Sequence, residues 1–239
     1  MLKKMLCVAV ICLGATFTEA APNNVVELAL AEVGSGSAKE MRIRIFSIPI
    51  TVLGSDYRRE AIERLPASIR HQRITSGRHL SRAEKVIRPV LQLHERTEYV
   101  ELFLYQNDRP RAALWMGCVL ILSDSLVALL YDAELAGIVA HELAHSYFMD
   151  DMAASQRTND ERRMKVIELK CDAVAMLSLK FLGSDPTCYI RGVKKIVNMM
   201  HKNNSSSVPY IRQSSYELIT HPSVVERAMF AQRFIKLLT

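Results

Sequence analysis

Five residues, His141-Glu142-Leu143-Ala144-His145, constrain this chain more than any other segment. On a helix, a spacing of four residues puts both imidazoles on one face, where each can give a nitrogen to the same metal ion. The carboxylate beside the first histidine can then take a proton from a water molecule. The pattern therefore predicts a helix that carries two metal ligands, His141 and His145, and a general base, Glu142.

The residues around this motif predict that its helix is buried. Apolar residues recur at steps of four and form one row, which comprises Leu135, Val139, Leu143 and Tyr147 and is widened by Ile138 and Phe148. Asp132 is the expected N-cap, and Glu134 favours the first turn. The alternative is a solvated helix that carries the motif by chance, but such a helix would not favour apolar neighbours. Buried histidine and glutamate side chains need partners, and a metal ion would supply one.

A second helix is expected at residues 164–182, and it offers the third ligand that a catalytic zinc site requires. Glu168 and Asp172 share one face of this apolar run at a spacing of four. We interpret Glu168 as the third ligand and Asp172 as the acceptor that orients a ligand histidine through its other ring nitrogen. The alternative is an exposed acidic pair that interacts with Lys165 and Lys170.

Taken together, these motifs resemble the gluzincin metallopeptidases of the HtpX-like and CAAX-prenyl-endopeptidase type. The matching features, in chain order, are an edge strand at Ala112-Ala113-Leu114-Trp115, a strand at 118–123, the two motifs above, a helix opened by Asp185-Pro186, and His221-Pro222 followed by Arg227. The resemblance covers residues 83–236. Arg111, Trp115 and Cys171 depart from the family pattern, which bears on substrate preference more than on zinc chemistry.

The resemblance implies an α+β, zincin-like fold that is mostly helical, with a small mixed sheet beside the zinc helices and one Zn²⁺ per chain. It also implies that His221 hydrogen-bonds the oxyanion, that Arg227 supports this segment, and that an extended substrate pairs with residues 112–115. His221 could equally be a simple helix cap before Pro222.

The expected function is zinc-dependent endopeptidase activity, in which metal-activated water attacks a peptide bond, and the expected partner is a protein or peptide substrate. The expected role is quality control or maturation of cell-envelope proteins. The alternative is a non-catalytic, zinc-stabilised binding or chaperone-like module of the same fold. Glu142 favours the enzyme, because a structural zinc site needs no base.

The N-terminus predicts export. Lys3 and Lys4 precede an apolar run, and Ala20 offers a cleavage site, so residues 1–20 are interpreted as a bacterial-type signal peptide of a periplasmic or secreted protein. A retained anchor is less favoured, because the run is short for a bilayer. Residues 21–40 are expected to form an N-terminal segment with a flexible link at 34–37, and residues 41–239 a single metallopeptidase domain.

Several further elements follow from local patterns. We expect strands at 42–53 and 100–105, a helix that starts at a Ser81–Glu84 capping box and is kinked or shifted by Pro89, and mobile loops at 150–163 and 203–209. Four histidines without partners at ligand spacing are interpreted as surface residues, namely His71, His79, His94 and His201.

The net charge of +6 is concentrated, because residues 58–88 hold nine Lys or Arg against three Glu. A solvated face is the default interpretation, and peripheral contact with an anionic envelope or membrane surface is a further hypothesis. No nucleic-acid partner is expected, since the segment lacks interleaved aromatic residues.

The three cysteines outside the signal, Cys118, Cys171 and Cys188, allow at most one internal disulfide. The sequence leaves the oligomeric state open.

Overall fold

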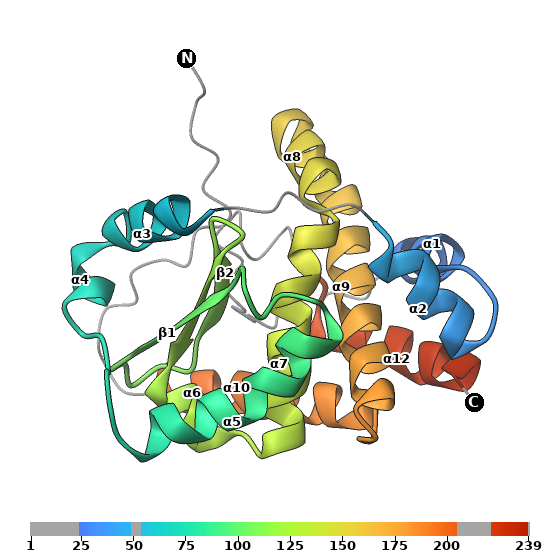
Figure 1. The fold of residues 1–239 in the computed structure, drawn as a ribbon. Helices are drawn as coiled ribbons and strands as arrows, with labels where there is room; N and C mark the ends of the chain where they lie inside the picture. The colour runs from blue at the N-terminus through green and yellow to red at the C-terminus, as the bar shows by residue number, and fades with distance from the viewer. Residues whose placement is uncertain (1–23, 49–53, 205–220, 239) are drawn as a thin grey trace.

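The structure is a computed structural model that describes residues 24–48, 54–204 and 221–238, so the predicted signal peptide lies outside the described residues. Its helices are α1 (Asn24–Val33), α2 (Ala38–Phe46), α3 (Ser55–Glu63), α4 (Ala67–Arg70), α5 (Arg78–Leu93), α6 (Asp124–Leu129), α7 (Asp132–Ala144), the 3-10 turn η1 (His145–Tyr147), α8 (Met149–Thr158), α9 (Glu161–Phe181), α10 (Thr187–Asn204) and α12 (Val224–Leu238). The described part of the chain is therefore mostly helical (Figure 1).

A three-stranded mixed sheet accompanies these helices. Its strands are β1 (Glu101–Tyr105), β2 (Ala112–Trp115) and β3 (Val119–Ser123), in the order β1-β3-β2. β3 runs parallel to β1 and antiparallel to β2, and all five of its residues are buried, as expected for the central strand. The α+β class and the small mixed sheet predicted from the sequence are confirmed, and β2 is an edge strand, as expected.

Helices α7 and α9 lie side by side at the centre of the molecule. The sheet lies on one side of α7, and α1, α2 and α12 lie beyond α9 (Figure 1). Fourteen of the 21 residues of α9 are buried, because neighbouring helices cover it on several sides. The segment 34–37, expected as a flexible link, joins α1 to α2, and both of these helices pack against α9.

A second, smaller hydrophobic cluster lies under α3. Ala61 and Leu65 pack there against the sheet residues Phe103, Tyr105 and Trp115. The Trp115 indole donates a hydrogen bond of 2.9 Å from Nε1 to the carbonyl oxygen of Ala61, which ties the edge strand to α3. The sheet thus separates this small cluster from the main core around α7 and α9.

Two predicted elements were wrong in type. The strand expected from residue 42 is helix α2, because Ser37 and Glu40 form a capping box and the buried residues Met41 and Ile45 lie four apart. The mobile loop expected at 150–163 is mostly helix α8, which ends where Asn159 adopts a left-handed conformation. The loop expected at 203–209 lies almost wholly outside the described residues.

Two predicted helix starts were also displaced. α5 begins at Arg78 rather than at Ser81, and it continues through Pro89. The N-cap of α7 is Tyr131 rather than Asp132, and Glu134 accepts a 2.9 Å hydrogen bond from the Tyr131 amide. Among the described helices, none combines the length and the apolar character that a membrane crossing requires.

Candidate metal centre

The candidate centre is built by α7 and α9. His141 and Glu142 lie in the last turn of α7, His145 follows directly, and Glu168 lies on the facing side of α9. A third helix, α10, approaches α7 at Gly137, where an added Cβ would lie 3.2 Å from the Cα of Tyr189. Glycine at this position therefore lets Tyr189 come close to the first histidine.

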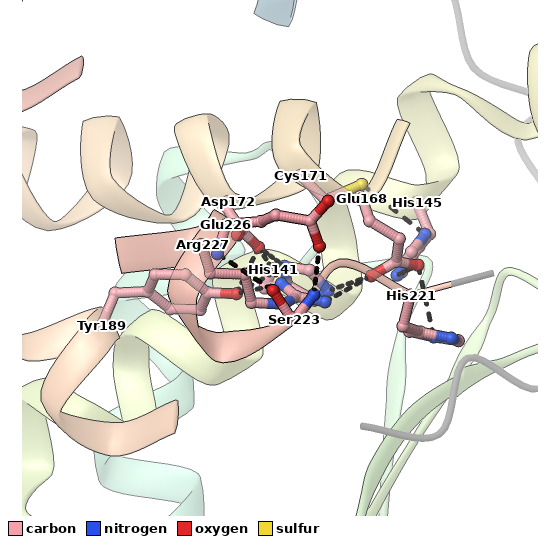
Figure 2. Close-up of polar contacts among 10 residues, drawn as sticks. All are labelled: His141, His145, Glu168, Cys171, Asp172, Tyr189, His221, Ser223, Glu226 and Arg227. Carbon is pink, nitrogen blue, oxygen red and sulfur yellow. Dashed lines mark hydrogen bonds and ion pairs between the residues drawn. The ribbon is translucent and has the colours of Figure 1, made fainter. Parts of the chain in front are cut away.

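The structure brings His141, His145 and Glu168 together. One ligand atom from each of these buried side chains lies within 4.8 Å of the others, so the three could hold a metal ion. The Nε2 atom of His141 is 3.4 Å from Glu168 Oε2, and the Nε2 atom of His145 is 3.7 Å from Glu168 Oε1 (Figure 2). The two imidazoles thus point their outer nitrogens at the same carboxylate.

Two properties of the candidate centre fit a bound cation: buried polar atoms without hydrogen-bond partners, and an excess of buried negative charge. His145 Nε2 and both carboxylate oxygens of Glu142 are buried, and no described residue gives them a hydrogen bond of good geometry. Arg227 supplies one positive charge between two buried carboxylates, those of Glu168 and Asp172. Because a buried charge without a partner is costly, a further cation beside these groups would stabilise them.

The ring nitrogen of His141 that faces away from Glu168 is held by two partners. Its Nδ1 lies 3.0 Å from Asp172 Oδ1 and 3.0 Å from the Tyr189 hydroxyl, which itself donates to Asp172. Since both neighbours can accept from an N–H at Nδ1, the neutral imidazole keeps its hydrogen there and has its lone pair on Nε2, the atom that faces Glu168. Asp172 therefore lies where it was expected, and Tyr189 joins it.

Arg227 is fully buried and connects the acidic groups. It donates from one guanidinium nitrogen to Glu168 Oε2 at 2.8 Å, and from another to Asp172 Oδ1 and, at 3.0 Å, to the Tyr189 hydroxyl (Figure 2). A planar guanidinium with two carboxylate partners fixes the position of both. Arg227 thus acts on the candidate ligand Glu168 directly rather than only on its own segment.

The pKa values of the ligand side chains follow from burial and charge. Burial acts to raise the pKa of Glu168, but His221, His145 and His141 hold it well below its ordinary value. Burial acts to lower the pKa of His141, yet Asp172 and Glu168 raise it to about 9. Burial lowers the pKa of His145 to about 4. In the metal-free protein a proton on His141 therefore occupies the electrostatic position that a cation would take.

Glu142 differs from Glu168 in its surroundings. Burial raises its pKa to about 8, and Glu168 adds to this effect, while His141 and the backbone amide of Leu114 oppose it. A carboxyl group with a pKa near neutrality can both take up and release a proton. Its proximity to Leu114 also places it beside the edge strand β2.

His221 lies at the centre but is not a helix cap. Its Nε2 atom is 3.6 Å from Glu168 Oε1 (Figure 2). The cap of α12 is Ser223, whose side chain accepts from the Glu226 amide at 3.1 Å, while Glu226 accepts from the Ser223 amide at 2.6 Å. The helix-cap interpretation of His221 was therefore wrong.

The four residues expected to bind substrate form β2 and are buried. In the part of the chain that the structure describes, no strand pairs with the outer edge of β2. The opposite edge of the sheet is partly covered, since Ile74 donates to the Leu104 carbonyl and Gln106 donates to that of Gln72.

The prediction that His94 is a surface residue was wrong. His94 is 2 % exposed, and its Nε2 lies 2.9 Å from the Ser178 hydroxyl, which donates to the Val174 carbonyl. Its Nδ1 lies 3.0 Å from the Tyr147 hydroxyl. Because the Ser178 proton is used elsewhere, Nε2 carries the hydrogen and the imidazole is neutral. Burial lowers the pKa of His94 to about 3, and Arg96 and Arg42 add to the effect.

This environment predicts a specific acid sensitivity. Because the pKa of His94 is lower in the folded chain than in the unfolded chain, unfolding takes up a proton, and stability is lost as pH falls from about 6.5 towards 3. A fall of two pH units within this window lowers the free energy of unfolding by ~3 kcal/mol. His94→Gln should therefore be less stable than wild type at pH 7, and this difference should shrink by pH 4.5. Urea unfolding with a chelator present measures it, and a pH-independent difference would contradict it.

Two residues of the centre, Tyr189 and Cys171, were not predicted as members, and only Cys171 has a signal in the sequence that spacing could detect. Tyr189 comes from α10, and its position depends on the close approach at Gly137. Cys171 follows Glu168 by three residues on α9, a spacing that puts both on one face, and its Sγ lies 3.6 Å from His145 Nδ1. Burial raises its pKa well above the ordinary value, and Glu168 and Asp172 add to this effect. Cys118, Cys171 and Cys188 are all free thiols.

Comparison of the sequence with models of protein families and with curated proteins gave no match.

Proposed function

We propose that the protein is a zinc-dependent endopeptidase with a zincin-like fold, in which His141, His145 and Glu168 hold the metal ion. The observation that carries the proposal is the convergence of these three buried side chains, together with the buried carboxylate of Glu142, to which no described side chain donates a hydrogen bond of good geometry. Two histidines and a glutamate are a ligand set that catalytic zinc sites use, and such sites keep a fourth position open.

Each side chain has a distinct role in this proposal. Bound to these ligands, zinc would polarise the substrate carbonyl and lower the pKa of a water molecule. Glu142 accepts the proton from that water at a carboxylate oxygen and passes it to the leaving amine. Asp172 keeps the hydrogen of His141 on Nδ1, and Arg227 fixes Glu168 and Asp172. His221, beside Glu168, donates to the oxygen on which negative charge develops.

The substrate would lie extended along β2. Its backbone would add as a strand to the outer edge of Ala112–Trp115, which has no paired strand among the described residues. Because Leu114 lies close to Glu142, this strand would bring a peptide bond to the general base. Backbone pairing is tolerant of sequence, so an unfolded protein is a suitable test substrate.

The resemblance to HtpX-like and CAAX-prenyl-endopeptidase-type enzymes supports the same activity through the order of its motifs. With the expected signal peptide, we propose that the enzyme acts in the periplasm or outside a bacterial cell, on envelope proteins that need maturation or removal. Contact between the basic segment 58–88 and an anionic membrane surface belongs to the same proposal.

Metal removal tests the proposal. Purified protein should contain one zinc per chain and cleave unfolded casein, and a chelator should abolish cleavage until zinc is returned. Zinc content is measured by atomic absorption, and cleavage by the release of soluble peptides. A protein that binds one zinc but cleaves none of a panel of unfolded proteins would favour the non-catalytic binding module. A protein without zinc affinity would reject both.

A further inference from the structure

The side chain of Cys171 contacts His145, one of the candidate metal ligands, and the proposed mechanism gives Cys171 no role. Its Sγ is 3.6 Å from His145 Nδ1, which is within hydrogen-bonding range for sulfur, and both side chains are buried. The next residue, Asp172, makes the corresponding contact with His141 Nδ1 at 3.0 Å. Two consecutive residues of α9 thus each face the Nδ1 atom of one histidine, in the turn after Glu168 (Figure 2).

The other nitrogen of His145 points towards the centre. Its Nε2 is 3.7 Å from Glu168 Oε1 and has no hydrogen-bond partner among the described residues, although it is buried. A neutral imidazole carries one hydrogen, so a metal on Nε2 requires that hydrogen to be on Nδ1. The atom placed to accept it is the sulfur of Cys171.

We propose that Cys171 is a positioning residue that accepts a hydrogen bond from His145 Nδ1 and so keeps Nε2 available for the metal ion. This inference rests on the proposed function. A thiol suits this place because sulfur accepts a weak hydrogen bond, whereas a carboxylate would add a third acid beside Glu168 and Asp172. Cys171 does not serve as a fourth ligand, because the group of converging ligand atoms does not include its sulfur.

Zinc affinity gives the first readout. Replacing a residue that orients a metal ligand typically weakens metal binding by about 10–100-fold. Because sulfur is a weak acceptor, we expect Cys171→Ala to raise the zinc Kd by about 5–30-fold, measured by competition with a chromophoric chelator under reducing conditions. The matched control is Cys118→Ala, which removes a buried thiol in the cluster under α3 and should leave the Kd unchanged.

The NMR signals of the imidazole hydrogens give a second readout. A change in packing alone would not alter which ring nitrogen carries the hydrogen. In zinc-loaded protein labelled with ¹⁵N-histidine, His145 should show a hydrogen on Nδ1 that exchanges slowly with solvent. Cys171→Ala should broaden this resonance or speed its exchange, while the corresponding His141 resonance keeps its partners Asp172 and Tyr189 and stays unchanged.

The outcomes separate this inference from the proposed function. If wild type binds no zinc, both are rejected. If wild type binds zinc and Cys171→Ala has the same Kd and the same His145 resonance, the inference alone is rejected. An equal loss of affinity in Cys171→Ala and Cys118→Ala would also reject it, because the effect would then come from a general loss of packing.

Discussion

Glu142→Gln should lower kcat/KM for peptide hydrolysis by about 10²–10⁴-fold, the usual contribution of a general base. The amide has nearly the shape of the carboxylate but cannot take up a proton. Because Glu142 lies outside the group of converging ligand atoms, the zinc Kd should stay within about threefold of the wild-type value. The variant therefore separates proton transfer from metal binding.

The free energy of unfolding adds a second readout for this variant. Burial raises the pKa of Glu142 to about 8, so its folded form holds a proton more tightly than its unfolded form does, and its contribution to stability falls as pH rises from about 4.5 to 8. A neutral amide has no such dependence. We therefore expect metal-free Glu142→Gln to be at least as stable as wild type at pH 8 in urea unfolding.

Glu134→Gln is the matched control. Glu134 is also a buried carboxylate of α7, about 10 Å along the helix from His141, and it accepts hydrogen bonds from the Tyr131 amide and from Lys195. This variant should keep both zinc and activity. If Glu142→Gln retained wild-type kcat/KM, Glu142 would not be the base. If it lost its zinc, the carboxylate would have a ligand role that the geometry does not give it.

Glu168→Gln should weaken zinc binding by at least about a thousandfold, or ~4 kcal/mol, because the loss of a ligand exceeds the 10–100-fold cost of losing a residue that orients one. Glutamine is preferred to alanine here because its carbonyl oxygen can still accept from Arg227, which would otherwise be left as a buried charge with one partner fewer. Zinc should be absent from the protein after dialysis against a weak chelator.

The same control, Glu134→Gln, should retain one zinc per chain under these conditions. Circular dichroism of metal-free Glu168→Gln should match that of metal-free wild type, which would show that the loss is local. Full zinc stoichiometry with unchanged Kd would mean that another residue completes the site. Peptide hydrolysis should fall together with zinc occupancy, in contrast to Glu142→Gln, where the two readouts separate.

The sequence predicted the centre well because its spacings act within single helices. The four-residue spacing of His141 in α7 and His145 directly after it, and of Glu168 and Asp172 on α9, determines which side chains share a face. Buried acids and imidazoles need partners, so the face that carries the histidines is expected to pack against the face that carries the acids. The edge strand at 112–115 was expected from the family resemblance, and its bounds match those of β2.

The features that the sequence did not predict depend on contacts between distant segments, which spacing does not encode. Tyr189 reaches the centre through the packing of α10 on Gly137. His94 is buried by partners on η1 and α9, so its polarity alone suggested the surface. The polar helix α8 was mistaken for a loop, because ion pairs of Arg163 and Lys170 with Asp151 stabilise it against α9 rather than an apolar face alone.

The small cluster under α3 gives the molecule two regions that we expect to differ in local stability. Only a few apolar side chains hold α3 on the sheet, whereas α9 is covered along most of its length. Regions with few buried contacts exchange their amide hydrogens through local fluctuations that leave the rest folded. We therefore expect the amide hydrogens of α3 to exchange with solvent faster than those of the paired helices α7 and α9.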